Sequence, residues 1–112
     1  MRIVLFSTDL MLYSSVSGAA SASGHEFHSG TDIDGLTTVL QKPDTLLCLD
    51  LNTANGDPAV LAAMMHPEVL ARSVAFGPHV HVEKLNAAKA AGFGTVMPRG
   101  QFVSQLMAIL NR

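Results

Sequence analysis

The sequence has 112 residues, of which 48% are hydrophobic and 14% charged, with a formal net charge of −2. This length gives room for one domain, residues 1–112, with a single sizeable core. No cluster of basic residues indicates a nucleic-acid partner, and no apolar run is long enough to span a membrane. The single cysteine, Cys48, cannot form an internal disulfide, so we expect a cytoplasmic protein.

The first half of the chain alternates strand and helix patterns. Residues 3–6 form a continuous apolar run, which is typical of a strand buried on both faces. Residues 7–9 then offer helix N-caps, and apolar residues follow at helical spacing up to a glycine stop at 24. A weak strand at 26–28 and a helix between Asp32 and Lys42 complete this half.

The second half repeats the alternation three times. We expect strands at residues 45–49, 73–76 and 95–97, each followed by a helical pattern, at 57–66, 82–92 and 102–110. Proline and glycine separate these segments, with His66-Pro67 expected to stop the middle helix.

Strict alternation of this kind predicts parallel strands with right-handed crossovers. The expected fold is α/β: a flavodoxin-like three-layer sandwich with a five-stranded parallel sheet, order 2-1-3-4-5, and five helices. In such sheets the working crevice lies beyond the carboxyl ends of the strands. That edge should carry Ser7, Thr8, Asp9, Asp50, Asn52, Gly77 and Arg99.

Over its whole length the chain resembles a response-regulator receiver domain of the CheY-like type. The resemblance is carried by residues 46–50, an apolar strand that ends in Asp50, where receivers place the phospho-accepting aspartate. It is also carried by residues 90–99, which look like the family's Ala-Gly turn, fifth strand and terminal lysine, with Arg99 at the lysine position. Gly56 lies in the loop where receivers often have Pro and Gly.

The resemblance implies two-component signal transduction, in which a histidine kinase feeds a phosphorelay to Asp50 with Mg²⁺. It also implies a protein partner, or a homodimer, through the face made by helix four, strand five and helix five. The apolar residues 102, 103 and 107 are compatible with such a face, and packing alone is the alternative explanation for them. No enzyme activity is expected.

Several pocket positions depart from the receiver pattern. Ser7 and Thr8 stand where receivers have an acidic pair, with one carboxylate a step later at Asp9. Gly77 stands where receivers have a Thr or Ser hydroxyl, and Arg99 replaces the lysine. Asp9 and Asp50 therefore make a weak Mg²⁺ candidate at best, while Arg99 is suited to grip Asp50 bidentately.

We therefore expect a stand-alone pseudo-receiver that acts by protein contact, with Asp50 phosphorylation impaired or lost. Two alternatives remain open: an active receiver phosphorylated on Asp50 with Mg²⁺, and a small-ligand-binding flavodoxin-like domain that uses the same crevice.

Structural explanations compete with these functional ones. Asp50 and Arg99 can form a strand-end salt bridge, and Asp9 can serve only as a helix N-cap. His79 and His81 are more simply solvated or capping residues than metal ligands. Cys48, in the middle of a strand, is expected to be a buried and inert thiol.

Overall fold

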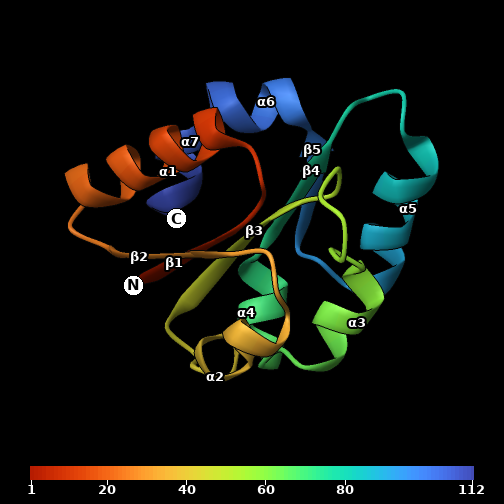
Figure 1. The fold of residues 1–112 in the computed structure, drawn as a ribbon, viewed down its shortest axis with the longest axis horizontal. Helices are drawn as coiled ribbons and strands as arrows, with labels where there is room; N and C mark the ends of the chain where they lie inside the picture. The colour runs from red at the N-terminus through yellow and green to blue at the C-terminus, as the bar shows by residue number, and fades with distance from the viewer.

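The computed structural model describes all residues 1–112 as one parallel five-stranded sheet in the order β2-β1-β3-β4-β5, with helices on both faces (Figure 1). This confirms the predicted strand order. The elements are β1 (Arg2–Phe6), α1 (Leu10–Ala22), β2 (Glu26–Gly30), a 3₁₀ turn (Asp34–Leu36), α2 (Thr37–Leu40), β3 (Thr45–Asp50), α3 (Pro58–Ala63), α4 (Pro67–Arg72), β4 (Val74–Gly77), α5 (Val82–Ala91), β5 (Thr95–Pro98), α6 (Arg99–Ser104) and α7 (Leu106–Leu110).

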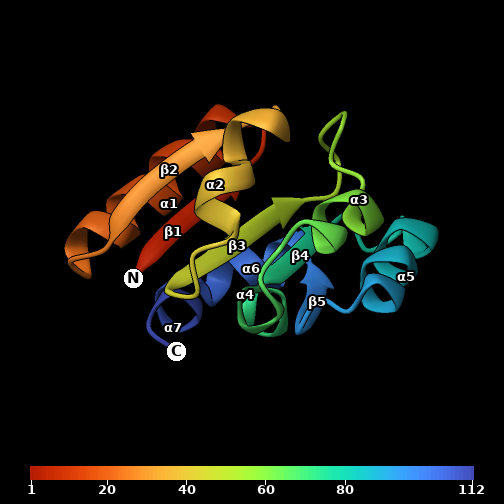
Figure 2. The ribbon, with the colours of Figure 1, turned by 90° about the horizontal axis from the view of Figure 1, so that it is seen from below.

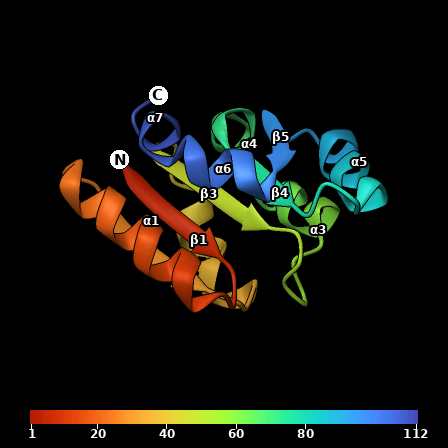
Figure 3. The ribbon, with the colours of Figure 1, turned by 90° about the horizontal axis from the view of Figure 1, so that it is seen from above.

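The central strands divide their side chains between two core layers, because successive residues of a strand point to opposite faces. In β1, Ile3 and Leu5 belong to the layer that α1, α6 and α7 cover, while Val4 and Phe6 belong to the layer under α2 to α5. Figures 2 and 3 show these two helix layers from their own sides. Burial on both faces explains why the strand segments are apolar without alternation.

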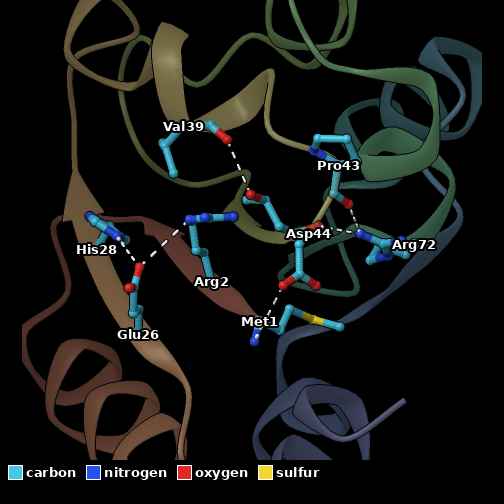
Figure 4. A network of polar contacts seen from close by, with 9 residues as sticks. Met1, Arg2, Glu26, His28, Val39, Pro43, Asp44 and Arg72 are labelled. Atoms are coloured by element: carbon cyan, nitrogen blue, oxygen red, sulfur yellow. Dashed lines mark hydrogen bonds and ion pairs between the residues drawn. The ribbon is translucent and has the colours of Figure 1, made fainter.

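A polar network anchors the sheet at the amino ends of its strands (Figure 4). The Arg72 guanidinium donates hydrogen bonds to the carbonyl oxygens of Pro43 and Thr45, which ties the end of α4 to the start of β3. On the other side, Arg2 of β1 pairs with Glu26 of β2, with 3.6 Å between Nε and Oε2. The network lies at the amino edge of the sheet, away from the carboxyl ends of the strands.

The structure has seven α-helices and one 3₁₀ turn, where the sequence predicts five helices. α3 ends at Ala63, with Met64 as its C-cap, and so stops before His66-Pro67. Pro67 instead occupies the first turn of α4, a helix that the sequence did not predict. The His66 ring accepts a hydrogen bond at Nδ1 from the N–H of Glu68 and so caps α4. The last predicted helix is divided near Gln105 into α6 and α7. None of these helices has the length and apolarity needed to cross a membrane.

Phe102 belongs to the core and not to the proposed contact face. Its ring is fully buried and stacks on Phe76, with 4.0 Å between centroids and 8° between planes. The expectation that Phe102 contributes to a partner surface is therefore wrong. Its neighbours Val103 and Met107 are 47% and 50% exposed.

Candidate functional site

Asp50 ends the central strand β3, and 4% of its surface is exposed. It lies beside Phe76 of β4, and the residue before it, Leu49, lies beside Phe6 of β1. The parallel register therefore brings the loops that follow β1 and β4 to either side of this carboxylate. The structure places Asp50 where the strand pattern predicts it, at the carboxyl end of the most buried strand.

Both carboxylate oxygens of Asp50 accept hydrogen bonds from the chain itself. The Ser7 hydroxyl, just after β1, donates to Oδ2 at 2.7 Å. The backbone N–H of Asn52 donates to Oδ1 at 3.0 Å. Hydrogen bonds to an ionised acceptor are stronger than those between neutral groups. Ser7 thus acts here as a hydrogen-bond donor to Asp50.

Asp9 and Arg99 form a separate ion pair beside this contact. Arg99 Nη2 lies 2.8 Å from Asp9 Oδ2, and both side chains are about one-third exposed, at 37% and 32%. The pair joins the start of α1 to the start of α6. The expected Arg99–Asp50 grip is not formed, because Asp9 takes the guanidinium, and the structure corrects that hypothesis.

Asp9 also caps α1, as the sequence analysis proposed. Its Oδ1 accepts hydrogen bonds from the N–H groups of Met11 at 2.9 Å and Leu12 at 3.1 Å. The Leu12 N–H is the main cause that lowers the pKa of Asp9 below its ordinary value of 3.8; partial burial opposes it, and Arg99 lowers the pKa further. Asp9 therefore stays ionised, with one oxygen bound to the helix N–H groups and the other paired with Arg99.

Gly77 ends β4 at a fully packed position next to Leu51. A Cβ atom added at Gly77 would lie 3.3 Å from the Leu51 Cβ, closer than side chains usually approach. Leu51 is 5% exposed, and its N–H donates to the Phe76 carbonyl at 2.8 Å, so the chain continues the β3 direction past Asp50. Leu51 thus fills the space beside Gly77.

Leu51 was missed by sequence reasoning. A large apolar residue one step after a strand-end aspartate, opposite a glycine in the next strand, is the signal that could have found it. Thr8 and Asn52 are exposed, and only the backbone N–H of Asn52 reaches Asp50.

The oxygen atoms available as metal ligands around Asp50 fit a Mg²⁺ ion poorly. Mg²⁺ needs near-octahedral oxygen ligands, usually from one or two carboxylates. One of the two carboxylates here is paired with Arg99, and the other accepts hydrogen bonds on both oxygens. No cluster of three or more His, Cys, Asp or Glu side chains in the chain could hold a metal ion.

The remaining candidate residues lie outside this site. Cys48 is fully buried in β3, and burial raises the pKa of its thiol to about 12, which keeps it protonated and unreactive. His79 and His81 lie in the loop that leads into α5, and His79 is exposed.

The fold is that of response-regulator receiver domains. The receiver domain of a Rhodospirillum rubrum response regulator is similar, at 14% identity and a TM-score of 0.72, over 98% of this chain and 91% of that one. The phosphorylated cyanobacterial phytochrome response regulator RcpA is also similar, at 18% identity and a TM-score of 0.63, over 97% and 87%.

NtrX from Brucella abortus, in a complex with ADP, matches at 20% identity and a TM-score of 0.76 over 99% of this chain. The chain spans about a quarter of NtrX, since it covers 26% of that protein. No protein-family model and no curated protein sequence matches the chain. At these identities the likeness establishes the receiver fold.

Proposed function

We propose that this chain is a receiver-like signalling module that works through protein contact, with aspartyl phosphorylation impaired or lost. The observation that carries the proposal is the occupied state of Asp50. Ser7 and Asn52 satisfy both of its oxygens, and 4% of the residue is exposed. The Ser7 hydroxyl therefore competes with any phosphodonor for Oδ2.

The residues around Asp50 also argue against phosphorylation. Phosphoryl transfer depends mainly on positioning and on neutralising charge. The Arg99 charge, which could neutralise a phosphoryl group, is already used by Asp9 at 2.8 Å. Gly77 offers no hydroxyl, and Leu51 packs against it. These contacts support a pocket that is held in one state by its own side chains.

A contact-based module needs a surface for its partner. We place it on the face formed by α5, β5 and α6 with α7, where Val82, Val103 and Met107 are 57%, 47% and 50% exposed. These exposed apolar side chains would supply contacts to a protein partner or to a second copy of the chain. A cytoplasmic location, with a histidine kinase or another signalling protein as partner, belongs to this proposal.

The first test asks whether Asp50 accepts phosphate. The protein is incubated with phosphoramidate and Mg²⁺ and measured by intact mass, beside a receiver that keeps its acidic pair and lysine. We expect no one-phosphoryl mass gain in this chain. A gain that disappears in Asp50→Asn would refute the proposal and support an active receiver.

The second test addresses the surface. Val103→Asp and Met107→Asp place a charge on the α6 and α7 side of the face, and Val60→Asp, on α3, serves as the matched control because it is similarly exposed at 49%. Sedimentation velocity should give a lower oligomeric state for the first two variants and no change for the control. Unchanged sedimentation for all three would remove the homodimer through this face.

A further inference from the structure

The sheet has an open edge at β2, which pairs only with β1 and lies at one end of the sheet (Figure 2). Sheets usually protect such edges with proline, lysine or a β-bulge. The strand at the other end, β5, ends in Pro98. In contrast, β2 has neither proline nor lysine, and its register with β1 is unbroken from Glu26 to Gly30. The edge of β2 is therefore free to pair with a further strand.

The backbone groups that face this edge can be assigned from the pairing with β1. The Glu26 N–H donates to the Met1 carbonyl at 3.1 Å, so the backbone of Glu26 faces β1. Backbone groups of a strand alternate in direction from one residue to the next. The N–H and carbonyl groups of Phe27 and Ser29 therefore point to the outer edge, and they form no backbone hydrogen bond to another loop or helix of the chain.

A second copy of β2, running antiparallel, presents the same groups in complementary positions. When His28 lies opposite His28 of the second copy, each Phe27 lies opposite Ser29 of the other chain. Residues that face each other in this way exchange both of their backbone hydrogen bonds, so the two pairs form four. Any other register moves Phe27 or Ser29 opposite a residue outside β2. The register centred on His28 is therefore the one that satisfies every outward group within the strand.

The α1 side of this edge carries an aromatic pair. The rings of Phe27 and Tyr13 have centroids 5.3 Å apart and planes at 82°, and Tyr13 is 47% exposed. In the register centred on His28, the two Phe27 side chains are diagonal neighbours, a separation that aromatic rings can span. Contact between these rings adds apolar burial to the backbone hydrogen bonds.

The opposite side of the edge carries charges that suit a second copy. Glu26 and His28 are exposed, and Glu26 Oε2 lies 3.6 Å from Arg2 Nε and 3.5 Å from His28 Nε2 (Figure 4). Arg2 balances the Glu26 carboxylate, so this part of the edge has little net charge that would repel a copy of itself. In the same register Glu26 is a diagonal neighbour of His28 of the second copy, which places an acceptor near a ring that can donate.

We propose that β2 is a self-association edge, through which two copies of this chain pair antiparallel about His28 and join their sheets into one. The dimer has twofold symmetry, so the contact closes and leaves no free β2 edge. Short edge strands supply a small interface, so we expect a weak dimer that depends on concentration. The inference goes beyond the proposed function, because β2 lies at the opposite end of the sheet from β5 and the face formed by α5, β5, α6 and α7.

Cysteine trapping tests the register. His28→Cys places two thiols opposite each other at a non-hydrogen-bonded pair, where Cα atoms lie about 4.5 Å apart and a disulfide can form. Glu26→Cys, on the same side of β2, is the control, because its two copies would lie about 13 Å apart. Air oxidation should link His28→Cys into a dimer and leave Glu26→Cys unlinked, while the buried Cys48 does not react. Equal linking of the two variants, or none in either, would overturn the proposal.

Val103→Asp separates this edge from the contact face of the proposed function. Added to His28→Cys, it should leave the yield of linked dimer unchanged, since Val103 lies on α6. Loss of the linked dimer would assign self-association to the other face and overturn the proposal.

Sedimentation velocity tests the same edge without a disulfide, and circular dichroism verifies that each variant is folded. Ser29→Pro removes an outward N–H, which an edge strand tolerates, and should abolish the dimer, whereas Ser29→Ala keeps the N–H and the dimer. His28→Lys places two like charges opposite each other and should weaken the dimer about threefold or more, while His79→Lys, in the exposed loop before α5, should not. A wild-type chain that stays monomeric at its highest soluble concentration, or an unchanged dimer in His28→Lys, would overturn the proposal.

Discussion

The contact between Ser7 and Asp50 can be measured with a double-mutant cycle. Ser7→Ala removes the hydroxyl that donates to Asp50 Oδ2 at 2.7 Å and leaves a carboxylate that is 4% exposed with one of its two hydrogen bonds. Hydrogen bonds to charged groups contribute about 1.5–3 kcal/mol to stability. We therefore expect Ser7→Ala to lower the free energy of unfolding by about 2 kcal/mol, or to lower Tm by roughly 8 °C.

The second arm of the cycle is Asp50→Ala. This substitution removes a buried charge together with its acceptors, so the cost of the lost hydrogen bonds is offset by the lost desolvation penalty. In the Asp50→Ala background the Ser7 hydroxyl has no carboxylate to bind but still accepts the Asp9 N–H at 3.1 Å, so Ser7→Ala should then cost only that weaker bond, about 0.5 kcal/mol. The expected coupling energy between the two positions is about 1.5–3 kcal/mol.

Urea unfolding at neutral pH, followed by circular dichroism, measures all four proteins of the cycle. Ser104→Ala is the control, because Ser104 is exposed and its hydroxyl bonds only to the Gln101 carbonyl within α6. A coupling energy below about 0.5 kcal/mol would refute the reasoning. It would mean that Ser7 does not hold Asp50 and that the carboxylate is open to a phosphodonor.

Three further predictions concern stability. Gly94→Ala should destabilise the fold by more than about 3 kcal/mol or prevent folding, because the new Cβ would lie 1.7 Å from the Ala71 carbonyl oxygen. Soluble yield and urea unfolding test this prediction, and a near-neutral effect on stability would contradict it. Ser73→Ala should cost about 1–3 kcal/mol, because its buried hydroxyl accepts the Leu47 N–H at 2.9 Å, and wild-type stability would exclude that role. Folding lowers the pKa of Asp9, so the stability that its charge contributes is complete well above the ordinary pKa of 3.8 and is lost as pH falls through the lowered folded pKa. Asp9→Asn keeps a helix cap, and its Tm should therefore differ from that of the wild type at neutral pH and approach it in acid. A Tm difference that does not depend on pH would count against the ionised pair.

The sheet could be predicted from the sequence because its signal is local. Fully apolar runs separated by capped helical patterns leave few topologies, and the parallel order places Ser7, Asp50 and Gly77 at one edge. The segment 67–72 was missed because a proline after a helical pattern predicts a stop, whereas Pro67 occupies the first turn of a new helix. Phe102 was misassigned because apolar residues on adjacent helical rows do not reveal which row faces the sheet.

The pairing within the site could not be predicted for a different reason. The sequence places Arg99 near two carboxylates, Asp9 and Asp50, but the choice between them depends on side-chain directions. Asp9 is fixed by the N–H groups at the start of α1, which turns its second oxygen toward Arg99. The Ser7 hydroxyl, and not Arg99, then donates a hydrogen bond to Asp50. Such choices are made by three-dimensional geometry, which spacing along the chain does not encode.

The packing of Leu51 against Gly77 has a consequence for the order in which this pocket can change. Any side chain at position 77 would bring its Cβ to 3.3 Å from the Leu51 Cβ, so Leu51 would have to shift by a few tenths of an ångström. Shortening Leu51 would make room at position 77, but that step by itself opens a gap in the core, because Leu51 is buried there. The effects of substitutions at positions 51 and 77 should therefore be coupled.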